Sequence, residues 1–98
     1  MKQIIDLQEY SKEVYKIKRL QAEADGRARI ISIMVESGMN NSENFAKYFS
    51  EYLDYCEKFN IAKNEFVNNT IAPKVNGTIM NWSISYDDME IVLDAKEV

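Results

Sequence analysis

Residues 7–35 read LQEYSKEVYKIKRLQAEADGRARIISIMV, and their spacing predicts the architecture of the whole chain. Mostly apolar or small side chains return at alternating steps of three and four residues, and these positions form the first seam: Leu7, Tyr10, Val14, Ile17, Gln21, Ala24, Ala28, Ile31 and Val35. Such steps place side chains along one side of a helix that packs lengthwise against another helix. The pattern therefore predicts a helix over about residues 7–37.

A second seam of the same kind follows Asn40. Its positions are Phe45, Phe49, Tyr52, Cys56, Phe59, Lys63, Phe66 and Thr70. When the chain is folded about Asn40 the two seams match, and the small Ala28 faces the large Tyr52, as close packing of facing layers requires. We therefore expect an antiparallel, coiled-coil-like helical hairpin, with the second helix over about residues 42–72.

Residues with known preferences for helix ends support these bounds. Asp6 suits the N-cap of the first helix, and Gly38 suits the left-handed position after its last turn. Either Asn41 or Ser42 suits the N-cap of the second helix. Pro73 disfavours helical geometry in the residue before it, so the second helix is expected to end there.

Two positions weaken the helices. Gly26 inside a helix costs about 1 kcal/mol relative to alanine, and Asn60 is also a weak helix former. The first seam keeps its phase on both sides of Gly26, so we expect a continuous helix. A break at Gly26, or one near Asn60 in the second helix, is the alternative.

The spacing changes to two after the turn signal Asn76-Gly77. Apolar side chains then alternate with mostly polar ones in two runs: Met80, Trp82, Ile84 and Tyr86, then Met89, Ile91 and Leu93. Alternation of this kind is typical of strands that bury one face. Residues 78–95 are therefore predicted to form a β-hairpin.

The loop of the β-hairpin sets its register. A two-residue loop at Asp87-Asp88 places Ile84 opposite Ile91 and brings nearly every large apolar side chain to one face. Two strands alone are marginal in stability, and residues 1–5 are available as a third strand. The expected fold class is α+β: a single domain, 1–98, with the C-terminal β-hairpin packed at the base of the helical hairpin.

The composition argues against most enzyme classes. The chain has no histidine, and its single cysteine, Cys56, lies at a seam position. Acid–base, nucleophile–base and zinc sites commonly depend on imidazole. The carboxylates of the β-hairpin suit turns and a solvated face better than a cation site: Asp87, Asp88, Glu90 and Asp94. We therefore expect no enzyme, no cofactor and no metal.

Charge and hydropathy narrow the expected partners further. The net charge of −4 argues against nucleic-acid binding, because neutralising phosphates usually needs a basic domain. The amino terminus lacks the apolar run of a signal peptide, and no stretch is long enough to cross a membrane. We expect a cytoplasmic protein without a membrane contact.

Apolar side chains outside the seams predict an oligomer interface near the tip of the helical hairpin. The candidates are Ile30, Ile33, Met34, Tyr48 and Leu53. They make the apolar surface wider than one partner helix can cover. We therefore expect a non-enzymatic homo-oligomeric interaction module, a dimer in the simplest case, with a protein partner.

A second hypothesis rests on the basic residues of the first helix. Forked guanidinium groups suit phosphate and carboxylate ligands, and the candidate contacts are Arg27, Arg29, Lys18 and Arg19. This alternative is a binder of a small anionic ligand or nucleotide, with its site at a subunit interface near Arg27 and Arg29. Acidic residues on the same helix favour a solvated mixed face instead.

Overall fold

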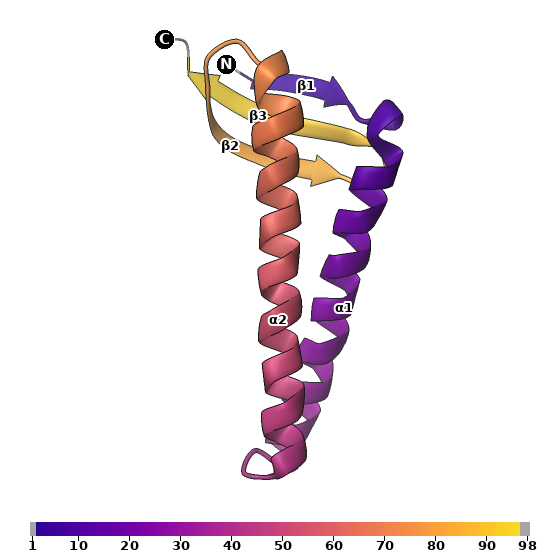
Figure 1. Ribbon diagram of the computed structural model, residues 1–98, viewed down its shortest axis with the longest axis vertical. Helices are drawn as coiled ribbons and strands as arrows, with labels where there is room; N and C mark the ends of the chain where they lie inside the picture. The colour runs from indigo at the N-terminus through magenta and orange to yellow at the C-terminus, as the bar shows by residue number, and fades with distance from the viewer. Residues whose placement is uncertain (1, 97–98) are drawn as a thin grey trace. The chain divides into compact units, whose positions relative to one another are not determined.

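A computed structural model describes residues 2–96 and has two long helices and one antiparallel sheet (Figure 1). The helices are α1 (Ser11–Glu36) and α2 (Glu43–Phe66), and the strands are β1 (Lys2–Asp6), β2 (Thr78–Ser85) and β3 (Glu90–Lys96). The predicted α+β class, with a helical hairpin and a β-hairpin, is therefore confirmed. The chain divides into a sheet unit, Met1–Lys16 with Lys63–Val98, and a helical unit, Ile17–Ala62.

The sheet unit has the strand order β1-β3-β2. Residues 2–6 form β1 and pair antiparallel with β3, so the expected third strand is present. The core combines the start of α1, the end of α2, the turns after it and β3: Leu7, Val14, Phe66, Val67, Ile71, Val75, Ile91, Leu93 and Ala95. The base of the helical hairpin and the β-hairpin thus share one core.

The predicted register of the β-hairpin is confirmed. Trp82 pairs with Leu93 and Ile84 pairs with Ile91. The strands end at Ser85 and Glu90, so four residues rather than two lie between them. Met89 takes a left-handed φ of 51° within this loop.

One part of the predicted alternation in β2 is wrong. The pairs Ile79–Ala95 and Asn81–Asp94 enclose a bulge at Met80, where β2 holds one residue more than β3. Because side chains alternate along a strand, the extra residue exchanges the faces on either side of it. Ile79 is therefore partly buried in place of Met80, whose side chain is 58% exposed.

Helix α1 is continuous through Gly26, as expected. It begins later than predicted, because residues Gln8–Tyr10 form a 3₁₀ turn whose Gln8 N–H donates to Asp6 Oδ1 at 3.0 Å. Gly38 has a φ of 74°. The helix ends in two backbone bonds typical of a glycine C-cap, from Gly38 N–H to Val35 O at 3.1 Å and from Met39 N–H to Met34 O at 2.8 Å.

Helix α2 is capped by Ser42, whose Oγ accepts from the Phe45 N–H at 3.1 Å. It continues without a break past Asn60. The helix ends before Pro73, as expected: α2 stops at Phe66, a π turn follows at Val67–Ile71, and the proline lies in a separate 3₁₀ turn at Ala72–Lys74. Pro73 is tolerated there because the first turn of a helix does not need its missing N–H.

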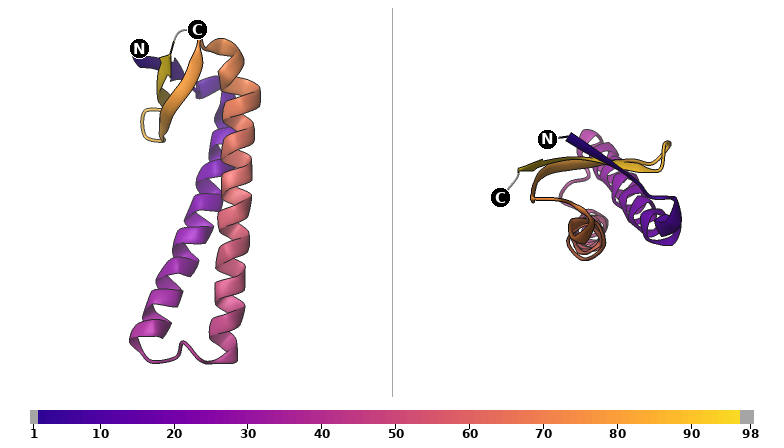
Figure 2. Two further views of the ribbon diagram at one scale, coloured as in Figure 1. Left: turned by 90° about the vertical axis from the view of Figure 1, so that its left-hand side faces the viewer. Right: turned by 90° about the horizontal axis from the view of Figure 1, so that it is seen from above.

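In the helical unit α1 and α2 run antiparallel and are joined by residues 37–42 (Figures 1 and 2). The part of the first seam nearest this loop is predicted wrongly. Met34 is only 7% exposed, whereas the seam residue Val35 is 51% exposed. The buried side of α1 at this end of the helix therefore lies at Met34 and not at Val35.

Candidate interaction surfaces

Exposed apolar side chains gather near the loop end of the helical unit. We call this set the tip surface, and its members are Ile30 (40% exposed), Ile33 (62%), Val35 (51%), Met39 (46%), Phe49 (42%) and Leu53 (52%). All of them lie within about three helical turns of the loop. Ile33 and Val35 lie two apart on a continuous helix and so face different sides of α1, whereas Ile30 and Ile33 share one side of α1 and Phe49 and Leu53 share one side of α2. Single exposed apolar residues are ordinary, and these two pairs are the candidate contact surface.

The structure separates the residues predicted for the oligomer interface. Ile30, Ile33 and Leu53 are exposed and belong to the tip surface, whereas Tyr48 is half-buried. Met34 is buried within the chain, at 7% exposure. Sequence reasoning also missed Val35 and Phe49, because both had been assigned to the seams.

A groove of about 310 Å³ adjoins the tip surface and is lined by residues of both helices: Ala22, Glu23, Gly26, Arg27, Ile30, Tyr48 and Glu51. Ile30 belongs to the groove and to the tip surface alike. A Cβ built at Gly26 would meet nothing within 4 Å. The groove is therefore open above the glycine, where the backbone of α1 itself forms part of the wall.

Arg27 lines this groove, and its positive charge is paired with two carboxylates. Its Nη1 lies 2.6 Å from Glu23 Oε2, and its Nε lies 3.4 Å from Glu51 Oε2 on α2. The guanidinium carbon stands 4.1 Å from the centre of the Tyr55 ring. The hydrogen bond to Glu23 raises the pKa of Arg27. These contacts join α1 to α2 and keep two carboxylates beside one cation.

The other basic residues do not gather around Arg27. Arg29, Lys18 and Arg19 are exposed on α1. In a continuous helix, residues two apart point roughly 200° from each other, so Arg27 and Arg29 face different sides. The four predicted anion contacts therefore do not form one cluster with Arg27 as its centre.

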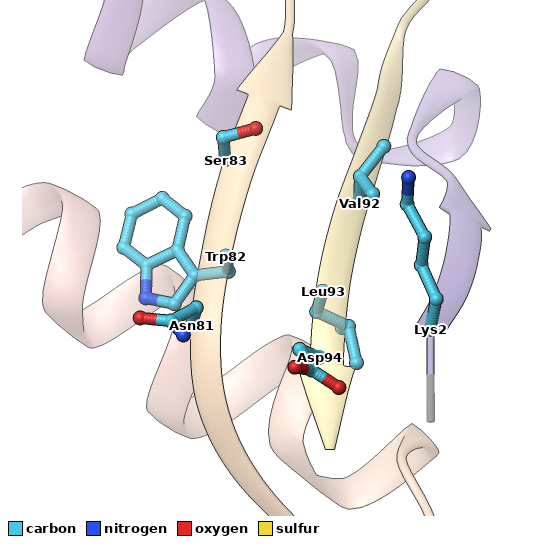
Figure 3. A pocket seen from close by; sticks show the side chains of 7 residues that line it. All are labelled: Lys2, Asn81, Trp82, Ser83, Val92, Leu93 and Asp94. Atoms are coloured by element: carbon cyan, nitrogen blue, oxygen red, sulfur yellow. The ribbon is translucent and has the colours of Figure 1, made fainter.

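A second, shallow groove of about 390 Å³ lies on the sheet unit (Figure 3). All three strands line it, through Lys2, Asn81, Trp82, Ser83, Val92, Leu93 and Asp94. Lys2 and Asn81 both pair with Asp94 in the register of the sheet, so a mixed polar row crosses all three strands. None of these side chains forms a nucleophile–base pair of the common kind.

Among residues 2–96 no group of three or more acidic or cysteine side chains is placed to hold a metal ion. The turn aspartate Asp88 instead accepts from the Ser85 hydroxyl at 3.0 Å. No helix in this part of the chain combines the length and hydropathy needed to span a membrane. Comparison with protein-family models, with curated proteins and with solved structures found no match.

Proposed function

We propose that this protein is a non-enzymatic assembly module that forms a homodimer through the tip surface and presents the same end of the helical hairpin to a protein partner. The observation that carries the proposal is the exposure of six large apolar side chains near one loop. Water contact with such a surface is unfavourable, and a second apolar surface removes it.

The burial of these side chains favours association. Full burial of a large aliphatic side chain contributes about 1.5–3 kcal/mol. Ile33 is 62% exposed and Leu53 is 52% exposed, and each occurs once in both copies of a symmetric dimer. Four such side chains would contribute several kcal/mol before the entropic cost of association is subtracted.

The groove beside the tip surface supports a second copy as the partner. A two-fold interface requires a surface that is complementary to itself. The helical unit offers protruding side chains such as Ile33 and an open groove at Gly26 within two turns of α1. An aliphatic side chain of one copy can therefore fill the groove of the other, with Tyr48 beside it.

The test is the mass of the protein in solution, measured by light scattering after size exclusion. Ile33→Glu introduces a charge into the tip surface and should lower the mass while helical circular dichroism persists. Ile61→Glu is the matched control, because Ile61 is also half-exposed, at 49%, but lies on α2 outside the tip surface. A wild type that stays monomeric at tens of micromolar, or an equal loss of mass in both variants, contradicts the proposal.

The anionic-ligand alternative has less support. Its central residue, Arg27, is paired with Glu23 and Glu51, and an incoming anion would have to displace one carboxylate and stand near the other. Like charges at such distances disfavour binding. Arg29 lies on another side of α1, so it does not add a second guanidinium group to the same site.

A further inference from the structure

Strand β2 forms an edge of the sheet with an unusual composition. The strand order of the sheet is β1-β3-β2, so only one side of β2 is paired with a strand of the described chain. Its sequence, TIMNWSIS, contains no charge and no proline over eight residues. Natural proteins usually protect an edge strand with charges, proline or short length, because its free N–H and C=O groups can pair with another strand.

The charges of this sheet lie on its other strands. The central strand β3 carries Glu90, Asp94 and Lys96, although its edges are already paired. The opposite edge, β1, is only five residues long and carries Lys2 and Asp6. Asp6 already accepts from the Gln8 N–H, and Lys2 stands opposite Asp94 in the sheet. The unprotected edge is therefore β2 alone.

The regular part of this edge is Asn81–Ser85. The bulge at Met80 interrupts the ladder before it, and a bulge disturbs pairing locally. Trp82 and Ile84 face the core side, whereas Asn81, Ser83 and Ser85 alternate with them on the other face. The indole of Trp82 is partly exposed and extends outward past the free edge of β2, away from β3 (Figure 3).

We propose that β2 pairs antiparallel with β2 of a second copy, about a two-fold axis at Ser83, so that both sheets join into one. The segment is complementary to itself in this register. Trp82 stands opposite Ile84 of the other copy twice, and aromatic residues opposite β-branched ones form favourable cross-strand pairs. On the other face Ser83 meets its own copy and Asn81 meets Ser85, with no like charges opposed.

This interface lies in the sheet unit and is separate from the tip surface. Either of the two proposals can therefore be wrong while the other is right. All tests therefore use the Ile33→Glu background, in which association through the tip is removed. The first test is a disulfide at the axis, in a chain that also carries Cys56→Ala. Directly opposed residues of antiparallel strands have Cα atoms about 4.5–5.5 Å apart, within the range of a disulfide. Ser83→Cys should therefore cross-link into a dimer under mild oxidation.

Asn81→Cys is the matched control for this cross-link. Residue 81 stands opposite residue 85 of the other copy, so two copies of residue 81 are offset by about 13 Å along the strands. That separation is too long for a disulfide. Equal cross-linking of both variants indicates random collision and overturns the proposal, as does failure of Ser83→Cys to cross-link.

The second test uses Trp82, the only tryptophan of the chain. Pairing buries its indole, so its emission should shift to shorter wavelength as the protein concentration rises. Ser83→Lys places like charges at the axis and should abolish the shift. Ile4→Lys, on the same face as Ser83 but at the opposite edge of the sheet, should leave the shift unchanged. A shift that survives Ser83→Lys, or one that Ile4→Lys abolishes, shows that β2 is not the paired edge.

Discussion

At the scale of single residues, Arg27 shows how a basic side chain beside a helical seam can join two helices. A strict heptad places Ala24 and Ala28 on the inner side of α1. Arg27 lies beside these positions and contacts Glu51 and Tyr55 of α2. A guanidinium between two carboxylates and a ring ties the two helices together, and this use of Arg27 competes with ligand binding.

Arg27→Ala should therefore lower the Tm of the protein, because it leaves Glu51 without its cation and removes the contact with Tyr55. Arg29→Ala is the control, since Arg29 is exposed, and surface substitutions of this kind change stability little. Thermal unfolding followed by circular dichroism measures both. An unchanged Tm in Arg27→Ala, together with the loss of a phosphate-dependent rise in Tm seen in the wild type, would favour the anionic-ligand alternative.

Replacing either of two glycines by alanine should change the stability of the protein, but in opposite directions. Gly26 lies inside α1, with open space around its missing Cβ. Gly26→Ala should therefore raise the stability of the monomeric double variant, Ile33→Glu with Ser83→Lys, by about 0.5–1 kcal/mol. Gly38 has a φ of 74°, so Gly38→Ala should lower stability by about 1–2 kcal/mol. Urea unfolding measures both, and destabilisation by Gly26→Ala would show that the groove is filled within the chain.

At the scale of elements, local patterns predicted what depends on neighbouring residues. The C-cap at Gly38, the cap at Ser42 and the pairing of Ile84 with Ile91 all follow from short-range turn chemistry and alternation, and all are present. The errors concern one end of α1 and one inserted residue. Near the loop the buried residue is Met34 and not the seam residue Val35, and the bulge at Met80 exchanges two faces without any local signal such as glycine.

The register of the β-hairpin gives a prediction at this scale. Ser85 stands opposite Glu90, so the pair Ser85→Cys and Glu90→Cys, in a Cys56→Ala chain, should form an intramolecular disulfide under mild oxidation. The control pair replaces Ser85 and Ile91, which lie on opposite faces and should not cross-link. Mass spectrometry after alkylation distinguishes the two. Ready formation of the 85–91 bond in place of the 85–90 bond would show that the register is shifted by one residue.

The residues of the candidate sites also divide into those whose positions the sequence predicted and those whose positions it did not. The exposure of Ile30, Ile33 and Leu53 was predictable, because each lies outside both seams and has no partner position on the other helix. The burial of Met34 and the pairing of Arg27 with Glu51 were not predictable. Both depend on which side of α1 faces α2 at that point of the helix. The free edge of β2 was also not predictable from spacing alone, since it requires knowing that β3 is the central strand.

At the scale of the whole molecule, the two proposed interfaces together decide the size of the assembly. The tip surface lies in the helical unit and the β2 edge lies in the sheet unit. Each is a two-fold contact that uses the same residues on both copies. A chain with one such contact stops at a dimer, whereas a chain with two different ones joins a third copy and continues to a closed ring or an open filament.

The wild type should therefore exceed a dimer as its concentration rises, measured by light scattering and sedimentation velocity. Ile33→Glu removes the tip contact and should stop growth at a dimer that cross-links through Ser83→Cys. Ser83→Lys removes the edge contact and should stop growth at a dimer without the shift in Trp82 emission. The double variant should be monomeric, because no symmetric contact remains. If either single variant is already monomeric, only one of the two surfaces joins copies of this chain, and the proposal for the other surface is wrong.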